Sequence, residues 1–259
     1  NYNIGIGTEA GAGITSGASN TMIGYQASKV ITTGTYNIIT GYQAGLALTT
    51  GASNQIFGYH AGKAITTGTY NIAIGDDALL AVTTGAKNLA IGWKSLRGTT
   101  TAQGNVGIGQ ETGRDSTGWN GTYIGQYAGR NKTSSSSYNT LIGYSAASSN
   151  SDIGASNTGV GSQVFGKMRA GASNTAIGRH AGYNISTGDY NIGIGSSGLG
   201  YAFSGTALTG DHNIGIGFET GHIISSGANN ILIGYKAGYA TTTADDNIAI
   251  GKQALTATT

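Results

Sequence analysis

Apolar and polar positions recur at a fixed interval along this whole chain. A unit reading Asn-x-x-Ile-Gly occurs fifteen times, and ten of the fourteen intervals between its closing glycines are 17 residues. Seventeen residues are too few for a strand, a helix and two turns, but they suffice for short strands joined at glycine corners. The pattern therefore predicts an all-β, parallel β-solenoid of about fifteen 17-residue coils, which we call rungs. The closing glycines are Gly7, Gly24, Gly41, Gly58, Gly75, Gly92, Gly109, Gly125, Gly143, Gly161, Gly178, Gly195, Gly217, Gly234 and Gly251.

The same repeat sets the expected domain organisation. We interpret residues 1–259 as a single repeat domain and as the interior segment of a longer fibre. Intervals of 16 and 18 residues place irregular rungs near 110–161, and the 22-residue interval marks an insertion at 196–212. Loops that leave a rigid solenoid are where binding surfaces are usually built.

Two features of the unit go beyond its length. Asparagine opens fourteen of the fifteen units; it tolerates left-handed backbone, and its side chain can stack as an amide ladder from rung to rung. A longer period is visible as well, because Gly-Ala-Ser-Asn at 17–20 and 51–54 alternates with Gly-Thr-Tyr-Asn at 34–37 and 68–71. This alternation indicates expansion through a 34-residue double unit.

The strand residues predict two apolar columns. The residue before each closing glycine, from Ile6 to Ile250, is apolar in every rung except at Thr40, which predicts a column facing the core of the coil. The residue one position earlier carries no charge and no amide in fifteen rungs. A strand that is apolar on both faces is buried on both, so we expect this second column to pack against another copy of the chain. The expected oligomer seam is Met22, Ile39, Ile56, Leu141 and Leu232.

Composition narrows the classes of function. Charged residues make up 9% of the chain, against about 25% in a typical soluble domain. The net charge of +2 does not indicate the positively charged surface expected of a nucleic-acid-binding protein. No run approaches the roughly 20 apolar residues of a membrane-spanning helix, so no membrane insertion is expected. With no cysteine in the sequence, disulfide scaffolds and cysteine-based zinc sites are excluded.

Motif matches give no support to catalysis. The spacing of Gly193, Gly195 and Gly198 resembles a dinucleotide fingerprint, but these glycines are repeat positions and no βαβ unit surrounds them. Asp189, Asp211 and Glu219 lie within two rungs of one another, a proximity expected by chance among eleven acidic residues. We therefore expect no enzyme, no cofactor and no metal site.

Aromatic residues are the more credible binding feature. The residue after the closing glycine is aromatic in seven of fifteen rungs and polar or charged in others, so this column must reach solvent. Exposed aromatics are favoured at interfaces, although their regular spacing also suits a ladder that merely shields backbone hydrogen bonds. The candidate binding residues are Tyr25, Tyr42, Tyr59, Trp93, Tyr144, Phe218 and Tyr235, with Tyr201 and Phe203 from the insertion. A second set precedes the repeat asparagine: Tyr2, Tyr36, Tyr70, Tyr138 and Tyr190.

At these residues the chain resembles two known repeat classes. Asn-Ile-Ala-Ile-Gly at 71–75 and 247–251, with Asn-Thr-Ala-Ile-Gly at 174–178, resembles the head repeat of YadA-like trimeric autotransporter adhesins. Gly-Tyr-Gln-Ala-Gly at 41–45 and Gly-Tyr-Lys-Ala-Gly at 234–238 are similar to repeats of phage tail-fibre proteins. The resemblance implies a parallel homotrimer of left-handed β-rolls.

The resemblance also implies a function. We expect the shaft or head of an adhesive fibre that spaces or carries host-receptor binding, in a virion tail fibre or on an extracellular cell surface. Its partners would be its own copies and a cell-surface glycan or protein receptor. One alternative is an ice-binding solenoid that uses the Thr-Thr pairs at 32–33, 49–50, 66–67 and 83–84. The other alternative is a polysaccharide-degrading tailspike.

Overall fold

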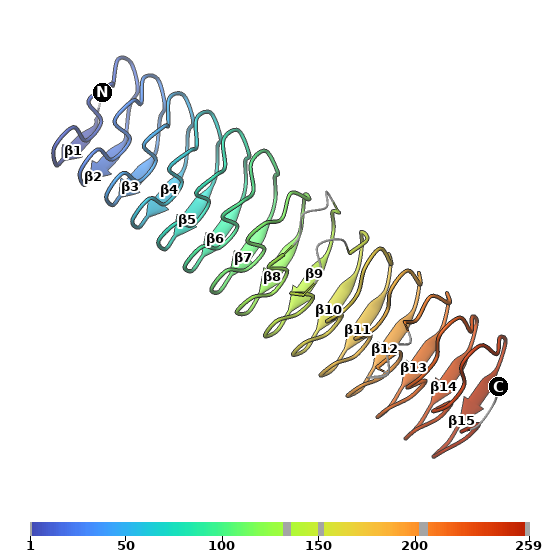
Figure 1. The fold of residues 1–259 in the computed structure, drawn as a ribbon. Coiled ribbons are helices and arrows are strands. Elements are labelled where there is room, and N and C mark those ends of the chain that lie inside the picture. The colour runs from blue at the N-terminus through green and yellow to red at the C-terminus, as the bar shows by residue number, and fades with distance from the viewer. Residues whose placement is uncertain (1, 132–135, 150–152, 202–206, 257–259) are drawn as a thin grey trace. The chain divides into compact units, whose positions relative to one another are not determined.

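The chain folds as the all-β, parallel β-solenoid that its repeat predicts (Figure 1). The computed structural model describes residues 2–131, 136–149, 153–201 and 207–256. Over these residues there are fifteen strands of three residues each and no helix. One strand therefore falls in each 17-residue repeat, and the rest of each rung consists of turns and bends.

The contacts divide the chain into two compact units, residues 1–127 and 128–259. Within each unit every strand pairs in parallel with the next strand of the sequence, as in the register of Ile4 with Thr21 and of Met22 with Ile39. The first unit holds β1 (Ile4–Ile6), β2 (Thr21–Ile23), β3 (Ile38–Thr40), β4 (Gln55–Phe57), β5 (Ile72–Ile74), β6 (Leu89–Ile91), β7 (Val106–Ile108) and β8 (Thr122–Ile124). The second unit holds β9 (Thr140–Ile142), β10 (Thr158–Val160), β11 (Thr175–Ile177), β12 (Ile192–Ile194), β13 (Ile214–Ile216), β14 (Ile231–Ile233) and β15 (Ile248–Ile250).

Left-handed backbone forms the corners of each rung. The positive φ values recur at the residue before the asparagine and at the second and fourth residues after the closing glycine, as at Tyr36 (58°), Gln43 (51°) and Gly45 (56°). The repeat asparagine, which tolerates this conformation, does not adopt it; the residue before it does. Hydrogen bonds between rungs hold these corners: the N–H of Tyr36 donates to Ala18 O at 3.1 Å.

The asparagine ladder is confirmed, and it is buried. Asn37 Nδ2 donates to Asn20 Oδ1 at 3.0 Å and to Gly51 O at 2.9 Å. Asn37 Oδ1 in turn accepts from the backbone N–H and the Nδ2 of Asn54, both at 3.0 Å. The Asn37 amide thus binds the side chain of the preceding rung and the backbone and side chain of the following rung.

The two apolar columns face the opposite way from the sequence prediction. The middle residue of each strand packs into the core of its own coil, and the predicted seam residues Met22, Ile39, Ile56, Leu141 and Leu232 are all buried there. The first and third residues of each strand point outward. The reason is parity: the buried asparagine lies two positions before the middle residue, so the two share the inner face.

Core volume is shared between two positions of each rung. Where the middle strand residue is large, the fourth residue after the closing glycine is small, as with Ile56 and Gly62. In five rungs with a small middle residue the order reverses, as with Gly159 and Phe165. A Cβ at Gly62 would lie 3.0 Å from Ile56 Cδ1, and one at Gly159 would lie 2.8 Å from Phe165 Cδ2. The two positions therefore compete for one space.

The insertion at 196–212 leaves the strands around it undisturbed. β12 and β13 pair in register, Ile192 with Ile214, across the 22-residue interval. Residues 202–206 lie outside the described part of the chain, so the predicted binding residue Phe203 does too. The extra length therefore does not alter the register of the sheet.

Candidate functional site: exposed aromatic columns and the outer strand face

The aromatic residues that follow the closing glycines reach solvent, as the sequence indicates. Tyr25, Tyr42 and Tyr59 are exposed, and their rings stack on one another in consecutive rungs with centroids 5.1 and 5.3 Å apart. Interplanar angles of 16° and 12° mean that neighbouring rings cover each other's faces. The stack therefore offers mainly ring edges and hydroxyl groups to a ligand.

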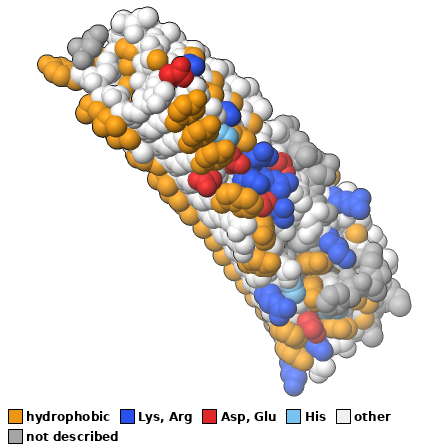
Figure 2. Space-filling model, turned by 60° about the vertical axis from the view of Figure 1, so that its left-hand side comes forward, with side chains coloured by type: hydrophobic (Ala, Val, Ile, Leu, Met, Phe, Trp, Pro, Cys, Tyr) orange, Lys and Arg blue, Asp and Glu red, His pale blue; other side chains and the backbone are white. Residues whose placement is uncertain are grey.

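The remaining members of this column are shielded in part by other neighbours. Lys94 Nζ lies 4.1 Å from the centroid of the Trp93 ring, a cation–π contact. Phe218 and Tyr235 stack with centroids 5.7 Å apart. Tyr144 is exposed like the others. Hydrophobic side chains accordingly follow one another in rows along the surface seen in Figure 2.

Tyr201, expected to serve in binding, is instead 8% exposed. Its ring stacks on His180 at 4.9 Å and meets the edge of His222 at 5.6 Å. Burial lowers the pKa of His180, and Arg179 lowers it further. Burial also lowers the pKa of His222, with Glu219 and Lys236 acting in opposite directions. The histidines and tyrosines here form a packed cluster, not an open site.

A row of polar side chains crosses five rungs of the first unit. Gln26 Nε2 donates to Glu9 Oε2 at 2.6 Å, and Gln43 Nε2 donates to Gln26 Oε1 at 2.9 Å. His60 Nε2 lies 3.1 Å from Gln43 Oε1, and its Nδ1 lies 3.8 Å from Asp77 Oδ1. Burial lowers the pKa of His60, Lys63 lowers it further, and Asp77 opposes the shift.

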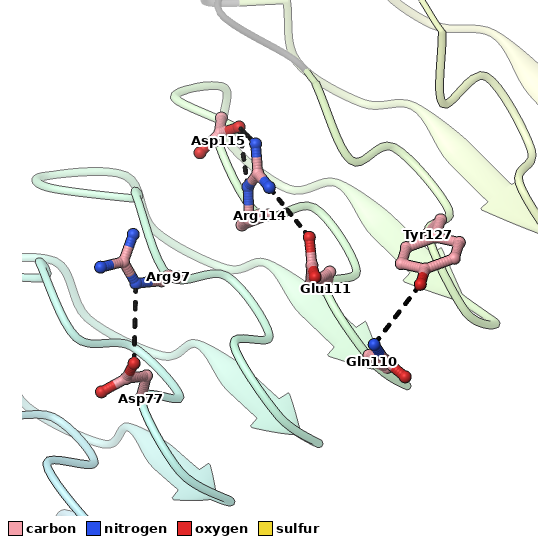
Figure 3. A network of polar contacts seen from close by, with 7 residues as sticks. All are labelled: Asp77, Arg97, Gln110, Glu111, Arg114, Asp115 and Tyr127. Carbon is pink, nitrogen blue, oxygen red and sulfur yellow. Dashed lines mark hydrogen bonds and ion pairs between the residues drawn. The ribbon is translucent and has the colours of Figure 1, made fainter.

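Figure 3 shows the ion pairs that continue along this side of the coil. Arg97 Nε lies 3.9 Å from Asp77 Oδ2. Arg114 pairs with Glu111 at 2.9 Å and with Asp115 at 2.6 Å, which raises the pKa of the guanidinium. Asp77, Glu111 and Asp115 are therefore each paired with an arginine side chain.

The carboxylates that the sequence places within two rungs of each other bind backbone or lysine. Asp189 Oδ1 accepts from the N–H of Ala172 at 2.7 Å, and Asp211 Oδ1 accepts from the N–H of Asp189 at 2.7 Å. Glu219 pairs with Lys236 at 3.3 Å. In the described ranges no group of three or more His, Asp or Glu side chains is placed to hold a metal ion.

The threonine pairs divide into two ranks. The first hydroxyl of each pair donates to the backbone of the next rung, as from Thr49 Oγ1 to Thr66 O at 3.1 Å. The second threonine is exposed. The exposed members of this second rank are Thr33, Thr50, Thr67, Thr84 and Thr101.

The aromatic residues before the asparagine are more exposed than the stacked column. In the first unit they are Tyr2, Tyr36 and Tyr70, in alternate rungs, with Ser19 and Ser53 in the rungs between. Sequence reasoning noted this set without putting it forward. The 34-residue period was the signal that separates it from the other column.

The outer face of the strands is the feature that sequence reasoning assigned to the wrong residues. The first and third residues of the fifteen strands include no charged residue, no glycine and a single amide, Gln55. Nearly all are β-branched, and several isoleucines are exposed, among them Ile6, Ile74 and Ile177. Isoleucine on both outer positions of a strand, as at β12 and β13, was the available signal.

Comparison with family models and with curated protein sequences finds no match to this chain. None of its described residues forms a helix with the length and hydropathy needed to cross a bilayer. What defines the molecule is therefore its own geometry: a parallel β-solenoid with an uncharged outer strand face and two columns of exposed aromatic residues.

Proposed function

We propose that this chain is a structural segment of an adhesive fibre and that its copies associate through the outer face of the strands. The observation that carries the proposal is the absence of charge from both outer strand positions in every rung. An outward-facing sheet surface in water normally collects polar residues, whereas apolar β-branched residues indicate a surface that becomes covered.

The extent of the face supports self-association. In the first unit it runs without interruption over β1–β8, a strip roughly 35 Å long at the usual spacing of strands. Soluble monomers rarely expose an apolar surface that continues over such a length. A second copy presents the same face, because every rung repeats it.

The kind of fibre is proposed from the repeat. The likeness to YadA-like adhesin heads and to phage tail-fibre repeats favours a parallel homotrimer, in a virion tail fibre or a trimeric surface adhesin. Receptor contact would then come from exposed columns and corners outside the seam. No catalytic step is part of this proposal, and the engaged carboxylates Asp189, Asp211 and Glu219 support that view.

Light scattering on the purified chain tests the proposal. We expect a mass near three times 26.0 kDa. Ile74 is 40% exposed in the single chain and lies on the proposed seam. Ile74→Lys should lower the mass, because association would then bury the charge of the lysine. Thr67→Lys, on an exposed corner of the same region, is the matched control and should leave the mass unchanged. A monomeric unaltered chain would refute self-association.

The second candidate function is ice binding, favoured by the exposed threonine rank of the first unit. Thr33, Thr50, Thr67 and Thr84 recur once per rung, and each first-rank hydroxyl is fixed by a backbone hydrogen bond. Thermal hysteresis in the unaltered chain, abolished by Thr67→Lys, would support this function. Its absence would leave the fibre as the better proposal.

A further inference from the structure

We propose that Tyr2, Tyr36 and Tyr70, which we call the spaced-tyrosine column, form a platform for an extended, uncharged polysaccharide chain that lies across the rungs of the first unit. The inference rests on the adhesive part of the proposed function, and it names the surface and the ligand class. It also moves the binding site away from the stacked column of Tyr25, Tyr42 and Tyr59.

Exposure distinguishes the two columns. The side chains of Tyr2, Tyr36 and Tyr70 are 89%, 67% and 62% exposed. The backbone of Tyr36 and of Tyr70 is nevertheless fixed, since the N–H of Tyr36 donates to Ala18 O and that of Tyr70 to Ala52 O, both at 3.1 Å. The rings therefore stand in solvent on a rigid support, which reduces the ordering cost of binding.

Spacing is the second difference. Tyr25 and Tyr42 occupy consecutive rungs and cover each other's faces at 5.1 Å. Tyr36 and Tyr70 are separated by two rungs, about 9.5 Å at the usual spacing of strands, which is too far for their rings to stack. Among the described residues neither ring makes a stacking contact with another aromatic ring. Each ring keeps a face for a ligand.

The ligand class follows from chemistry and period. Sugar rings present C–H faces that pack on aromatic rings, and their hydroxyls need partners around those rings. The tyrosine hydroxyls and the Ser19 and Ser53 side chains between them supply such partners, and this column carries no charge from Tyr2 to Tyr70. A β-linked chain presents equivalent faces once per disaccharide, a length comparable with two rungs. Several weak contacts in series then add through multivalency.

A proline-rich peptide is the competing ligand. Three residues of polyproline II helix advance about 9.3 Å, which also approaches two rungs. Such peptides dock in grooves lined by aromatic residues, whereas the tyrosines here stand free on the surface. The geometry therefore favours the polysaccharide.

Calorimetry of the full chain with cellohexaose and chitohexaose, each compared with its disaccharide, tests the proposal. At least one hexasaccharide should bind, and it should bind more tightly than its disaccharide because it reaches more than one ring. Tyr36→Ala should weaken hexasaccharide binding about threefold to tenfold, in line with the loss of one ring contact. Tyr42→Ala, in the stacked column, is the matched control and should leave the affinity unchanged.

A second variant tests spacing without removing a ring. Ser53→Tyr fills the gap between Tyr36 and Tyr70, and tyrosine already occupies the same left-handed corner in neighbouring rungs. The added ring would stack on its neighbours and cover their faces, so hexasaccharide binding should fall. Unchanged or stronger binding would show that the two-rung spacing has no role.

The outcomes separate this inference from the fibre proposal. No binding of either hexasaccharide, an equal loss in Tyr42→Ala, or binding of a proline-rich decapeptide in their place would overturn the polysaccharide platform. The mass of Tyr36→Ala is measured in parallel by light scattering. A lower mass would assign the column to the seam and also overturn the platform, while the fibre would stand. A monomer that binds hexasaccharide through Tyr36 would instead refute self-association alone.

Discussion

A buried amide in most rungs carries much of the local specificity of this fold. Asn37 makes hydrogen bonds to Asn20, Gly51 and Asn54, and the same set recurs in the rungs around it. Aspartate could not replace it, because the side chain must both donate and accept. The amide is therefore a structural requirement and is not available for ligand chemistry.

Asn37→Ala tests this role. It leaves Gly51 O and the N–H of Asn54 without their partner in a buried place, which we expect to cost about 1–3 kcal/mol of stability. Denaturant unfolding measures the loss, with Thr33→Ala on an exposed corner as the control. Equal stability of the two variants would contradict the role assigned to the ladder.

Histidines make stability depend on pH. Burial lowers the pKa of His180 and of His222 in the folded chain, so the unfolded chain takes up their protons first as the pH falls. The stabilising contribution is complete above the ordinary histidine pKa of about 6.5, and it is lost as the pH falls through the lower, folded value.

The expected result is a melting temperature that falls on acidification below about pH 6.5. His222→Phe should flatten that dependence and keep the aromatic contact with Tyr239, whose ring stacks on His222 at 4.8 Å. The Nδ1 atom of His222 has no hydrogen-bond partner among the described residues, so replacing the histidine by phenylalanine loses no hydrogen bond at that atom. An identical pH profile for the variant would contradict the assignment to His222.

At the scale of the rung, many rungs build their core from one large and one small residue at two facing positions. Ile56 pairs with Gly62, whereas Ala73 pairs with Leu79 in the next rung, so bulk moves from one side of the core to the other. This exchange accounts for the small middle residue of rungs such as that of Ala73. It also explains how Leu79 comes to occupy a left-handed corner at φ 52°.

A double-mutant cycle tests the pairing. Ala73→Leu alone should overpack the core and cost about 1–3 kcal/mol. Leu79→Gly alone should open a cavity and cost about 2–5 kcal/mol. The double variant places a large middle residue opposite a glycine, as Ile56 and Gly62 are placed. It should therefore be more stable than the sum of the two single losses implies. Strict additivity would contradict the shared space.

The solenoid itself could be predicted from the sequence because its period is explicit. The direction of the strand faces could not be read from hydrophobicity, since both columns are apolar. What decides the direction is that the middle strand residue lies two positions after the buried asparagine and so shares its inner face. The aromatic column was located correctly, but ring stacking and the burial of Tyr201 depend on three-dimensional contacts that spacing does not reveal.

Over the whole molecule, charge is kept away from the strand face. Ion pairs such as Lys29 with Glu9 and Lys236 with Glu219 gather at the corner that follows the closing glycine. The spaced-tyrosine column stands at the other end of each strand, before the asparagine. A fibre can thus use one surface for assembly and another for contact, which is the division of labour that the two proposals require.

The in-register pairing of successive rungs within each unit has a mechanical consequence. The hydrogen bonds between rungs run along the direction in which the rungs stack, so tension applied in that direction loads them one rung at a time. Each regular rung that yields releases 17 residues, or about 56–61 Å of extended chain. Under load the regular rungs would lengthen the chain in equal increments, and the rungs not yet reached would keep their hydrogen bonds.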